Sequence, residues 1–454
     1  MLPLLTHHLS PTRIGVLSID QTVIALGWIV TGSWLVSAML REYAAYAKRG
    51  ETPRFEATLR RSLMLVMGST IGFAGVVVGV GQISSAIGSY VAVIVGACFG
   101  FVLQNMAVTL FSASLRPRAF GIVEVTARVG GIVLGAALVL AGHGVGGYLL
   151  GLAAASLVVG AFGLAGAWPR RAGDPYSGPT DTRRWLAYGI PASSASVASW
   201  ALMFIDRYLL AGMRNSGAVG IYTVGNIVGD RLVSIPLAAF AAGSVPLLFS
   251  AFETSGLAEV ERLMRAYSRV IILLGFGCVA VVGGVSQALV RLVGGSAYAS
   301  AADVVPLVAL GAVLYGLAGL ATTGLMTAKH TRPLLYSSGI GLVANIAANI
   351  ALIPPLGIVG AAISTPIGTG AFLIAVTMWS RRHVTWRFPF QTLTRALVAA
   401  GLAYGASLAV AAHLHGLLIE LVLTSSTALV VYTGVIVLLQ EVHRRPHLGS
   451  TSRT

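Results

Sequence analysis

Three pairs of oppositely charged residues lie inside long apolar runs of the sequence. The pairs are Glu124 with Arg128, Asp206 with Arg207, and Asp230 with Arg231. Charged side chains are costly in such surroundings and usually serve a function there. An arginine binds a phosphate group through two parallel hydrogen bonds, so Arg128, Arg207 and Arg231 are candidates for binding an anionic ligand. The carboxylates of Asp230 and Glu124 are candidates for binding a coupling proton or cation.

Depth along each run separates these candidates. Arg231 lies eleven residues after Gly220, where its run begins, and therefore roughly 16 Å deep, near the midplane of a membrane. The alternative for Arg231 is a structural network. Arg128 lies about 12 Å from the edge of its run and shares a helical face with Glu124, so the two can form an ion pair that binds a ligand or only braces the helices. Arg207 lies near the far end of its run, where it faces a cavity or extends to lipid headgroups.

Other polar residues give weaker signals. Arg41 and Arg269 lie at predicted helix ends, where they either anchor the topology or contact the phosphate of a substrate. Asn345 and Asn349, four residues apart, predict hydrogen bonds across a helix interface. Asp20 lies near a predicted helix end and carries little signal.

Motifs for catalysis are missing from the sequence. It has no GxxxxGK[ST] nucleotide loop, no HExxH helix and no CxxC pair. Cys98 and Cys278 both lie in apolar runs and are expected to be core residues rather than ligands. We therefore predict no enzyme activity, no catalytic residue, no metal and no cofactor.

The composition explains where these residues sit. Of the 454 residues, 56% are hydrophobic and 10% are charged, whereas soluble domains carry roughly 25% charge. The net charge of +15 would suggest nucleic acid in a soluble protein, but the basic residues lie between the apolar runs. The chain is therefore predicted to be a polytopic membrane protein that does not bind nucleic acid.

Thirteen apolar runs reach the length of roughly 20 residues that a membrane-spanning helix needs. We predict an all-α fold whose spans are approximately 19–40, 62–81, 87–112, 120–141, 145–167, 186–211, 219–248, 268–289, 304–327, 333–353, 358–380, 393–414 and 417–439. The segment 252–269 alternates apolar and charged residues and predicts a separate amphipathic helix on the membrane surface.

The loops predict the orientation of the chain. Every second loop is basic, and these loops with the C-terminal tail hold 24 of the 30 Lys and Arg residues. Basic loops face the cytoplasm. We expect a multi-pass protein of a bacterial or archaeal cytoplasmic membrane, with its C-terminus in the cytoplasm.

Weak internal repeats divide the chain into two parallel halves. Three segments of the first half, from Gly15, Thr109 and His143, align in the same order with segments of the second half from Gly220, Gly324 and Leu356. Such repeats occur in transporters. The helix that precedes Gly220 has no counterpart before Gly15, so we expect that the first helix of a 14-helix plan is missing, because Met1 lies downstream of the true start or the chain is truncated.

Residues 19 to 380 resemble a known family. The segments are YGIPASSASVASWALMFIDRYLLAGMRNSGAVGIYTVGNIVG from Tyr188, GGSAYASAADVVPLVALG from Gly294 and ANIAANIALIPPLGIVGAAIST from Ala344. They resemble the polysaccharide-biosynthesis or O-antigen (Wzx-type) oligosaccharide flippases of the multidrug/oligosaccharidyl-lipid/polysaccharide transporter superfamily. The last two helices match an optional extra pair of that superfamily.

The resemblance implies two pseudo-symmetric helical lobes around a central cavity. The expected parts are an N-terminal lobe (1–168), a cytoplasmic linker (169–185), a C-terminal lobe (186–384), an extra helix pair (385–441) and a cytoplasmic tail (442–454). The implied activity is translocation of a polyprenyl-pyrophosphate-linked oligosaccharide from the inner to the outer leaflet by alternating access. The expected partners are this substrate, membrane lipids and other polysaccharide assembly proteins, and the expected state is a monomer.

Two other functions compete with this interpretation. A multidrug or cation exporter of the same superfamily would need an apolar cavity with cation-binding carboxylates, whereas the deep carboxylates Asp230 and Glu124 each have an arginine nearby. A membrane glycosyltransferase or polysaccharide polymerase would need larger outside loops than those predicted. We therefore favour an anionic substrate.

Overall fold

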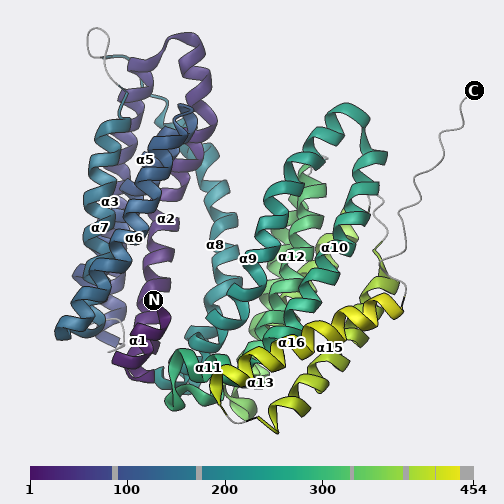
Figure 1. Cartoon of the computed structure of the whole chain (residues 1–454). Helices are drawn as coiled ribbons and strands as arrows, with labels where there is room; N and C mark the ends of the chain where they lie inside the picture. The colour runs from purple at the N-terminus through teal and green to yellow at the C-terminus, as the bar shows by residue number, and fades with distance from the viewer. Residues whose placement is uncertain (84–89, 170–175, 328–331, 382–387, 415, 440–454) are drawn as a thin grey trace, which may run out of the picture. The chain divides into compact units, whose positions relative to one another are not determined.

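The structure is a computed structural model that describes residues 1–83, 90–169, 176–327, 332–381, 388–414 and 416–439. Every regular element in these ranges is a helix (Figure 1). The helices are α1 (Leu2–His8), α2 (Pro11–Arg49), α3 (Thr52–Ile83), α5 (Val91–Ala113), α6 (Pro117–Leu138), η1 (Val139–His143), α7 (Gly144–Ala167), α8 (Thr182–Met213), α9 (Ser216–Ser255), α10 (Leu257–Gly284), α11 (Ser286–Gly294), η2 (Ser296–Asp303), α12 (Val305–Thr327), α13 (Arg332–Leu356), α14 (Ile358–Ser380), α15 (Phe390–Ala411) and α16 (Leu417–Leu438).

The all-α membrane fold is confirmed. Each of the thirteen predicted spans coincides with a long helix. Within the described ranges, 11 helices are long and apolar enough to cross a membrane, with Pro117–Ala167 counted as one and α8 not among them. The predicted tail 442–454, part of the linker (170–175) and the loop residues Lys329, Arg382 and Arg387 lie outside the described residues.

The prediction of a separate surface helix over 252–269 is wrong. Only Gly256, at φ 76°, interrupts the chain between α9 and α10, and α10 then continues without a break to Gly284. The polar residues of 252–269 thus form the end of α9 and the first turns of α10. Glycine permits this turn because it has no Cβ to clash at positive φ.

The first of two compact units comprises Met1–Tyr208. Its core includes Met39, Met106 and Leu110, which are all almost fully buried. Trp185, from the first turn of α8, belongs to the same core and lies 5.3 Å from the ring of Phe55. The start of α8 is therefore anchored in the first unit.

Polar contacts reinforce this anchor. Asp181, just before α8, accepts hydrogen bonds from Tyr46 of α2 and, at 2.8 Å, from Arg54 of α3. Arg184 of α8 lies 3.1 Å from the carboxylate of Glu42 on α2. The contacts bind α8 to both α2 and α3.

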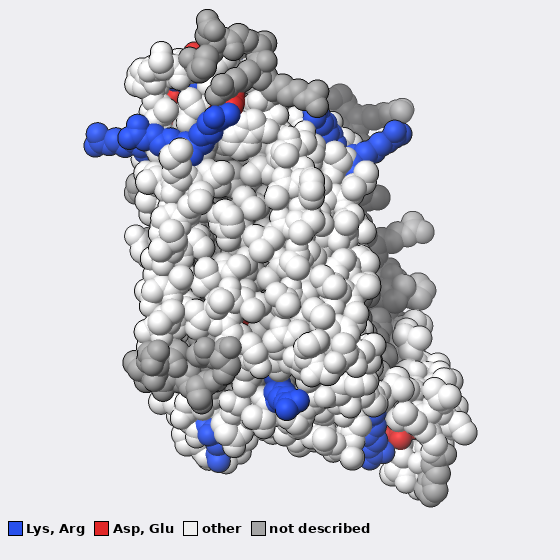
Figure 2. All heavy atoms as spheres, turned by 90° about the vertical axis from the view of Figure 1, so that its left-hand side faces the viewer, with Lys and Arg blue, Asp and Glu red and all other residues white. Residues whose placement is uncertain are grey.

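One face of this unit fits a membrane environment. In Figure 2, Lys and Arg lie near the two ends of the face, and the broad band between them carries almost no visible charge. The band includes α3, whose most apolar window is only 17% buried. A lipid environment accounts for such an exposed apolar surface.

The second unit comprises Leu209–Thr454. The structure describes its residues 209–327, 332–381, 388–414 and 416–439. Helix α14 packs on both α12 and α13, and α12 packs on α9 and α10. The final pair, α15 and α16, packs on α10, where Tyr432 donates a hydrogen bond to the carbonyl of Leu273 at 2.7 Å.

The two halves repeat the same helices, as the sequence predicts. Helices α2 and α5 begin at Pro11 and Val91, and α9 and α12 begin at Ser216 and Val305, so the two pairs are spaced alike along the chain. Gly147 and Gly360, aligned by the repeat, both leave no room for a Cβ, which would meet Leu138 at 3.0 Å and Leu352 at 2.2 Å, respectively. Both glycines of this aligned pair therefore lie at a close contact with the preceding helix.

Candidate functional site

The predicted ion pair on α6 is confirmed. Arg128 donates a hydrogen bond to Glu124 one turn earlier, and Gln104 of α5 donates to the other oxygen of that carboxylate at 3.3 Å. The Glu124 side chain is 25% exposed, whereas the Arg128 side chain is 73% exposed. The carboxylate is thus held against the bundle, and the guanidinium is presented on its surface.

The second pair, on α8, is buried. Asp206 and Arg207 are each only 5% exposed. The Arg207 guanidinium lies 4.8 Å from the ring centre of Phe204 and donates a hydrogen bond to the carbonyl of Met203 at 3.5 Å. A side chain that extended to lipid headgroups would be exposed, so this burial disagrees with the headgroup alternative for Arg207.

The two residues of the third pair lie on different faces of α9. Asp230 is half-buried and accepts a hydrogen bond from Ser234 at 2.8 Å, whereas Arg231 is exposed. Because α9 begins at Ser216 and runs to Ser255, Arg231 lies near the middle of this helix. Pro236 does not end the helix. Asp230 and Arg231 therefore have separate surroundings, and the arginine is the more exposed of the two.

Arg41 and Arg269 lie farther from helix ends than predicted. Helix α2 continues to Arg49, and α10 already begins at Leu257. The Arg41 guanidinium lies 4.1 Å from the ring centre of Tyr188 on α8. Arg269 is half-buried in the second unit. Arg41 is thus part of the contact between α2 and α8.

The structure also buries a carboxylate that carries little signal in the sequence. Helix α2 begins at Pro11, capped by Ser10, so Asp20 lies more than two turns inside it rather than near its end. Asp20 is 0% exposed. The Ser-Pro pair is a known start signal for a helix and could have located this start in the sequence.

Three hydrogen bonds join α2 to α8 around and beyond this residue. The hydroxyls of Thr22 and Tyr208 are 2.8 Å apart. Trp200 donates to the carbonyl of Thr22 at 3.1 Å, and Ser33 donates to Ser193 at 2.8 Å. The α2–α8 interface therefore combines apolar packing with buried polar groups.

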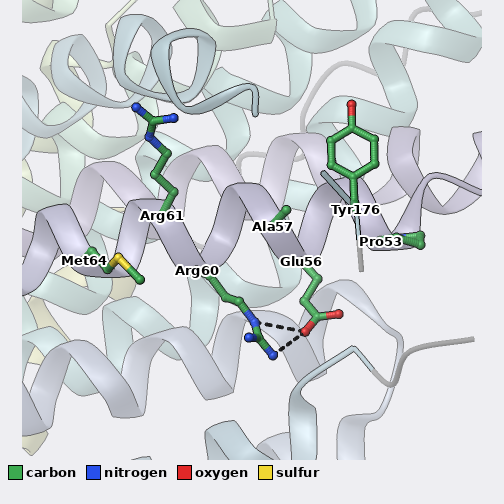
Figure 3. Close-up of a pocket in the computed structure, with 7 residues that line it drawn as sticks. All are labelled: Pro53, Glu56, Ala57, Arg60, Arg61, Met64 and Tyr176. Carbon is green, nitrogen blue, oxygen red and sulfur yellow. Dashed lines mark hydrogen bonds and ion pairs between the residues drawn. The ribbon is translucent and has the colours of Figure 1, made fainter. Parts of the chain in front are cut away.

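A small basic pocket of about 230 Å³ lies at the start of α3. Figure 3 shows the side chain of Arg60 turned toward Glu56, with Arg61 pointing away from this pair. Arg60 contacts Glu56 at 2.8 Å, and Glu56 also accepts a hydrogen bond from Trp168 at 3.1 Å. None of the predicted site residues lines this pocket.

A larger cavity of about 900 Å³ lies within the second unit, between α10, α11 and α12 on one side and α15 and α16 on the other. Phe276, Leu310 and Leu397 contribute to its apolar lining. Arg291 and Glu420 also line it and lie 3.8 Å apart. The cavity is thus mostly apolar, with one ion pair at its wall.

Metal ligands do not cluster in the described ranges: no three His, Cys, Asp or Glu side chains lie close enough there to hold a metal ion. Cys98 and Cys278 are free thiols. The arrangement suits binding of an anionic or amphiphilic ligand, with arginines exposed on otherwise apolar helices.

At the level of sequence, no protein-family model and no curated protein matches the chain. At the level of structure, the chain is similar to the lipid II flippase MurJ in an inward closed conformation, with a TM-score of 0.75, 12% identity, and coverage of 98% of this chain and 97% of that one. It is similar to an inward-facing multidrug resistance MATE transporter of the MOP superfamily, with a TM-score of 0.68, 17% identity, and coverage of 85% and 93%. A MOP transporter from Pyrococcus furiosus gives a TM-score of 0.60 at 15% identity, with coverage of 84% and 90%. The chain therefore has the two-lobed helical fold of these membrane transporters.

Proposed function

We propose that the protein is a flippase that moves a polyprenyl-pyrophosphate-linked oligosaccharide from the inner to the outer leaflet of a bacterial or archaeal cytoplasmic membrane, with its C-terminus in the cytoplasm. The observation that carries the proposal is the exposed Arg231 near the middle of α9, inside an apolar span. An arginine at that depth is costly unless it serves a polar ligand or a water-filled cavity. A pyrophosphate is a ligand of the matching charge and geometry.

Other arginines are proposed as further substrate contacts. Arg128 is exposed, and its carboxylate partner Glu124 is held by Gln104, so a pyrophosphate can replace the carboxylate as the acceptor of the guanidinium. Arg207, Arg41 and Arg269 are further proposed contacts as the two lobes alternate between inward and outward openings. Glu124 and Asp230 are the proposed binding groups for a coupling proton or cation, since the sequence contains no GxxxxGK[ST] loop that would bind ATP.

The lipid tail needs an apolar path while the head group crosses. The cavity between α10–α12 and α15–α16 is lined largely by apolar side chains and measures about 900 Å³. It can hold part of an isoprenoid chain within the hydrocarbon region. The fold of the lipid II flippase, which is matched over almost the whole chain, supports a lipid-linked substrate.

The second candidate is a multidrug exporter, because MATE transporters share the fold. The two functions predict opposite results after gene deletion. Deletion of a flippase gene leaves completed lipid-linked glycan in the inner leaflet, which a glycosidase that cannot cross the membrane fails to digest. Deletion of an exporter gene leaves glycan distribution unchanged and raises sensitivity to cationic drugs.

Substitution of Arg231 tests the site itself. Arg231→Ala should lower glycan export at least about tenfold, corresponding to the loss of one charge-assisted contact of about 1.5–3 kcal/mol, whereas Arg231→Lys should keep part of the activity, because the charge survives and the bidentate geometry does not. The measurement is outer-leaflet glycan per unit of protein in the membrane. Arg214→Ala is the control, because Arg214 follows the end of α8 and donates to the carbonyl of Ile353 at 3.2 Å. Equal export by the wild type and Arg231→Ala would remove Arg231 from the site.

A further inference from the structure

The basic pocket at the start of α3 lies where the polar end of this helix meets its exposed apolar part. Pro53, Ala57 and Met64 line the pocket and form a strip along one face of α3, because they are four and seven residues apart. Arg60 and Arg61 also line it, and Figure 3 shows their side chains extending to the two sides of the helix. The pocket is therefore an apolar strip with a guanidinium group on each side.

Contacts with neighbouring residues hold Arg60 in this position. Its Nε and Nη2 atoms lie 3.1 and 2.8 Å from one oxygen of Glu56, and its guanidinium lies 5.9 Å from the ring centre of Trp168. The Arg60 side chain is nevertheless 52% exposed, whereas Glu56 is buried. The charge of Arg60 is thus presented at the surface by a side chain that its neighbours orient.

Arg61 is available to a ligand. Its side chain is exposed, and it makes no ion pair or hydrogen bond with the described residues. A guanidinium binds a phosphate group through two parallel hydrogen bonds. Since Arg60 and Arg61 outnumber the one carboxylate in the pocket, Glu56, the pocket favours an anion.

Beyond the pocket, α3 presents an apolar surface. Met64 and Ile71 are 69% and 72% exposed. Gly68 and Gly72 continue the strip, and a Cβ on either would meet nothing within 4 Å among the described residues. Because α3 is long and apolar enough to cross a membrane, this face can lie against a hydrocarbon chain. A ligand that fits both the pocket and the strip has an anionic head and an apolar chain.

The second unit shows how the protein covers the aligned face of α10. The predicted repeat places Gly72 of α3 on Gly277 of α10, at the same spacing that relates Gly15 to Gly220. A Cβ on Gly277 would lie 3.0 Å from the ring of Tyr432 on α16. In the second unit, therefore, a helix of the chain covers this face, whereas in the first unit the described residues leave it open.

We propose that this face of α3 binds an anionic phospholipid, whose phosphate lies in the basic pocket and whose acyl chain lies along the strip from Met64 to Gly72. The loop charges predict that this end of α3 faces the cytoplasm, where anionic lipids attract basic residues near the membrane surface. On α3 the lipid would take the place that α16 takes on α10. The site belongs to the first unit alone and does not depend on the proposed function.

Native mass spectrometry of the full-length protein in detergent tests the proposal, with dioleoyl phosphatidylglycerol and dioleoyl phosphatidylcholine as probes. We expect the wild type to bind phosphatidylglycerol more tightly. Arg61→Ala should weaken this binding about fivefold, which corresponds to about 1 kcal/mol for one basic residue near the surface, and should leave phosphatidylcholine binding unchanged. Arg61→Lys should keep part of the preference, because the charge survives.

The choice of variants separates the site from general effects. Arg61 is replaced in preference to Arg60, because loss of Arg60 would leave the buried Glu56 without its ion-pair partner. Arg118→Ala is the matched control: Arg118 is exposed on α6, lies outside the pocket and is predicted to face the same side of the membrane. It should retain the wild-type affinity for phosphatidylglycerol.

Three results would overturn the proposal. The first is equal affinity of the wild type for the two lipids. The second is an equal loss of phosphatidylglycerol binding in Arg61→Ala and Arg118→Ala, which would assign the preference to the overall charge of the protein. The third is displacement of the long-chain lipid by millimolar inorganic phosphate, which would assign the pocket to a free phosphate in place of a lipid.

Discussion

Helices α2 and α9 are related by the predicted internal repeat, yet they carry different residues at one aligned position. The alignment of Gly15 with Gly220 places Asp20 of α2 on Gly225 of α9. The carboxyl of Asp20 is fully buried, whereas a Cβ on Gly225 would lie 2.5 Å from the carbonyl oxygen of Ala301 on η2. One half thus uses the position for a titratable group, and the other uses it for close backbone packing. Similar helices in a repeated fold need not carry similar functions.

The largest effect is expected when Gly225 is replaced by aspartate, the residue type that Asp20 provides at the aligned position of the first half. Gly225→Asp combines overlap with the backbone of η2 and an unpaired buried charge, and should destabilise the protein by about 3–5 kcal/mol. Thermal unfolding of the purified protein in nanodiscs measures this. Gly225→Ala should lose only the steric part, about 1–3 kcal/mol, and Gly243→Ala is the control, because a Cβ there meets nothing within 4 Å. Wild-type stability in Gly225→Asp would show that the two helices are interchangeable here.

A second prediction concerns a position at which the two halves agree. Gly147→Ala and Gly360→Ala should each destabilise the protein by about 1–3 kcal/mol, because both added methyl groups meet the preceding helix. Gly360→Ala should have the larger effect, since its contact at 2.2 Å is with a backbone oxygen. Gly339→Ala, on α13 with open space around it, provides the reference. Equal unfolding temperatures for all three variants would contradict the equivalent packing.

Much of the fold could be predicted from the sequence because apolar length and loop charge are local properties. The thirteen spans were recoverable in this way. The Glu124–Arg128 pair was recoverable because four-residue spacing fixes a shared helical face. Asn345, predicted to bond across a helix interface, does donate to the carbonyl of Ser364 on α14 at 3.0 Å, whereas Asn349 bonds to Asn345 within its own helix.

The features that were missed depend on tertiary contacts. Hydropathy predicts that the first span begins at residue 19, which places Asp20 at the start of that helix. In the structure, α2 begins at Pro11 after the cap at Ser10, so Asp20 lies inside it. Burial of Arg207 depends on Phe204 and on the packing of α8, which no run of apolar residues reveals. The continuity of α9 and α10 past 252–269 depends on one glycine turn. Charge alternation alone could not separate a surface helix from the polar end of a long one.

The smallest predicted effect concerns η2, the element that covers Gly225. Tyr298 of η2 is fully buried, and burial raises its pKa to about 12, above the usual value of about 10. Its contribution to stability is therefore complete below about pH 10 and is lost as the pH rises toward 12, because the unfolded chain ionises first. The difference in unfolding free energy between the wild type and Tyr298→Phe should be constant up to about pH 10 and then move against the wild type by on the order of 1 kcal/mol. Unfolding of both proteins in nanodiscs across this range measures the difference, and parallel curves throughout would mean that Tyr298 ionises in η2 as readily as in the unfolded chain. A confirmed shift would show that η2 stays packed over α9 in the membrane, which is the condition under which position 225 has no room for an aspartate side chain.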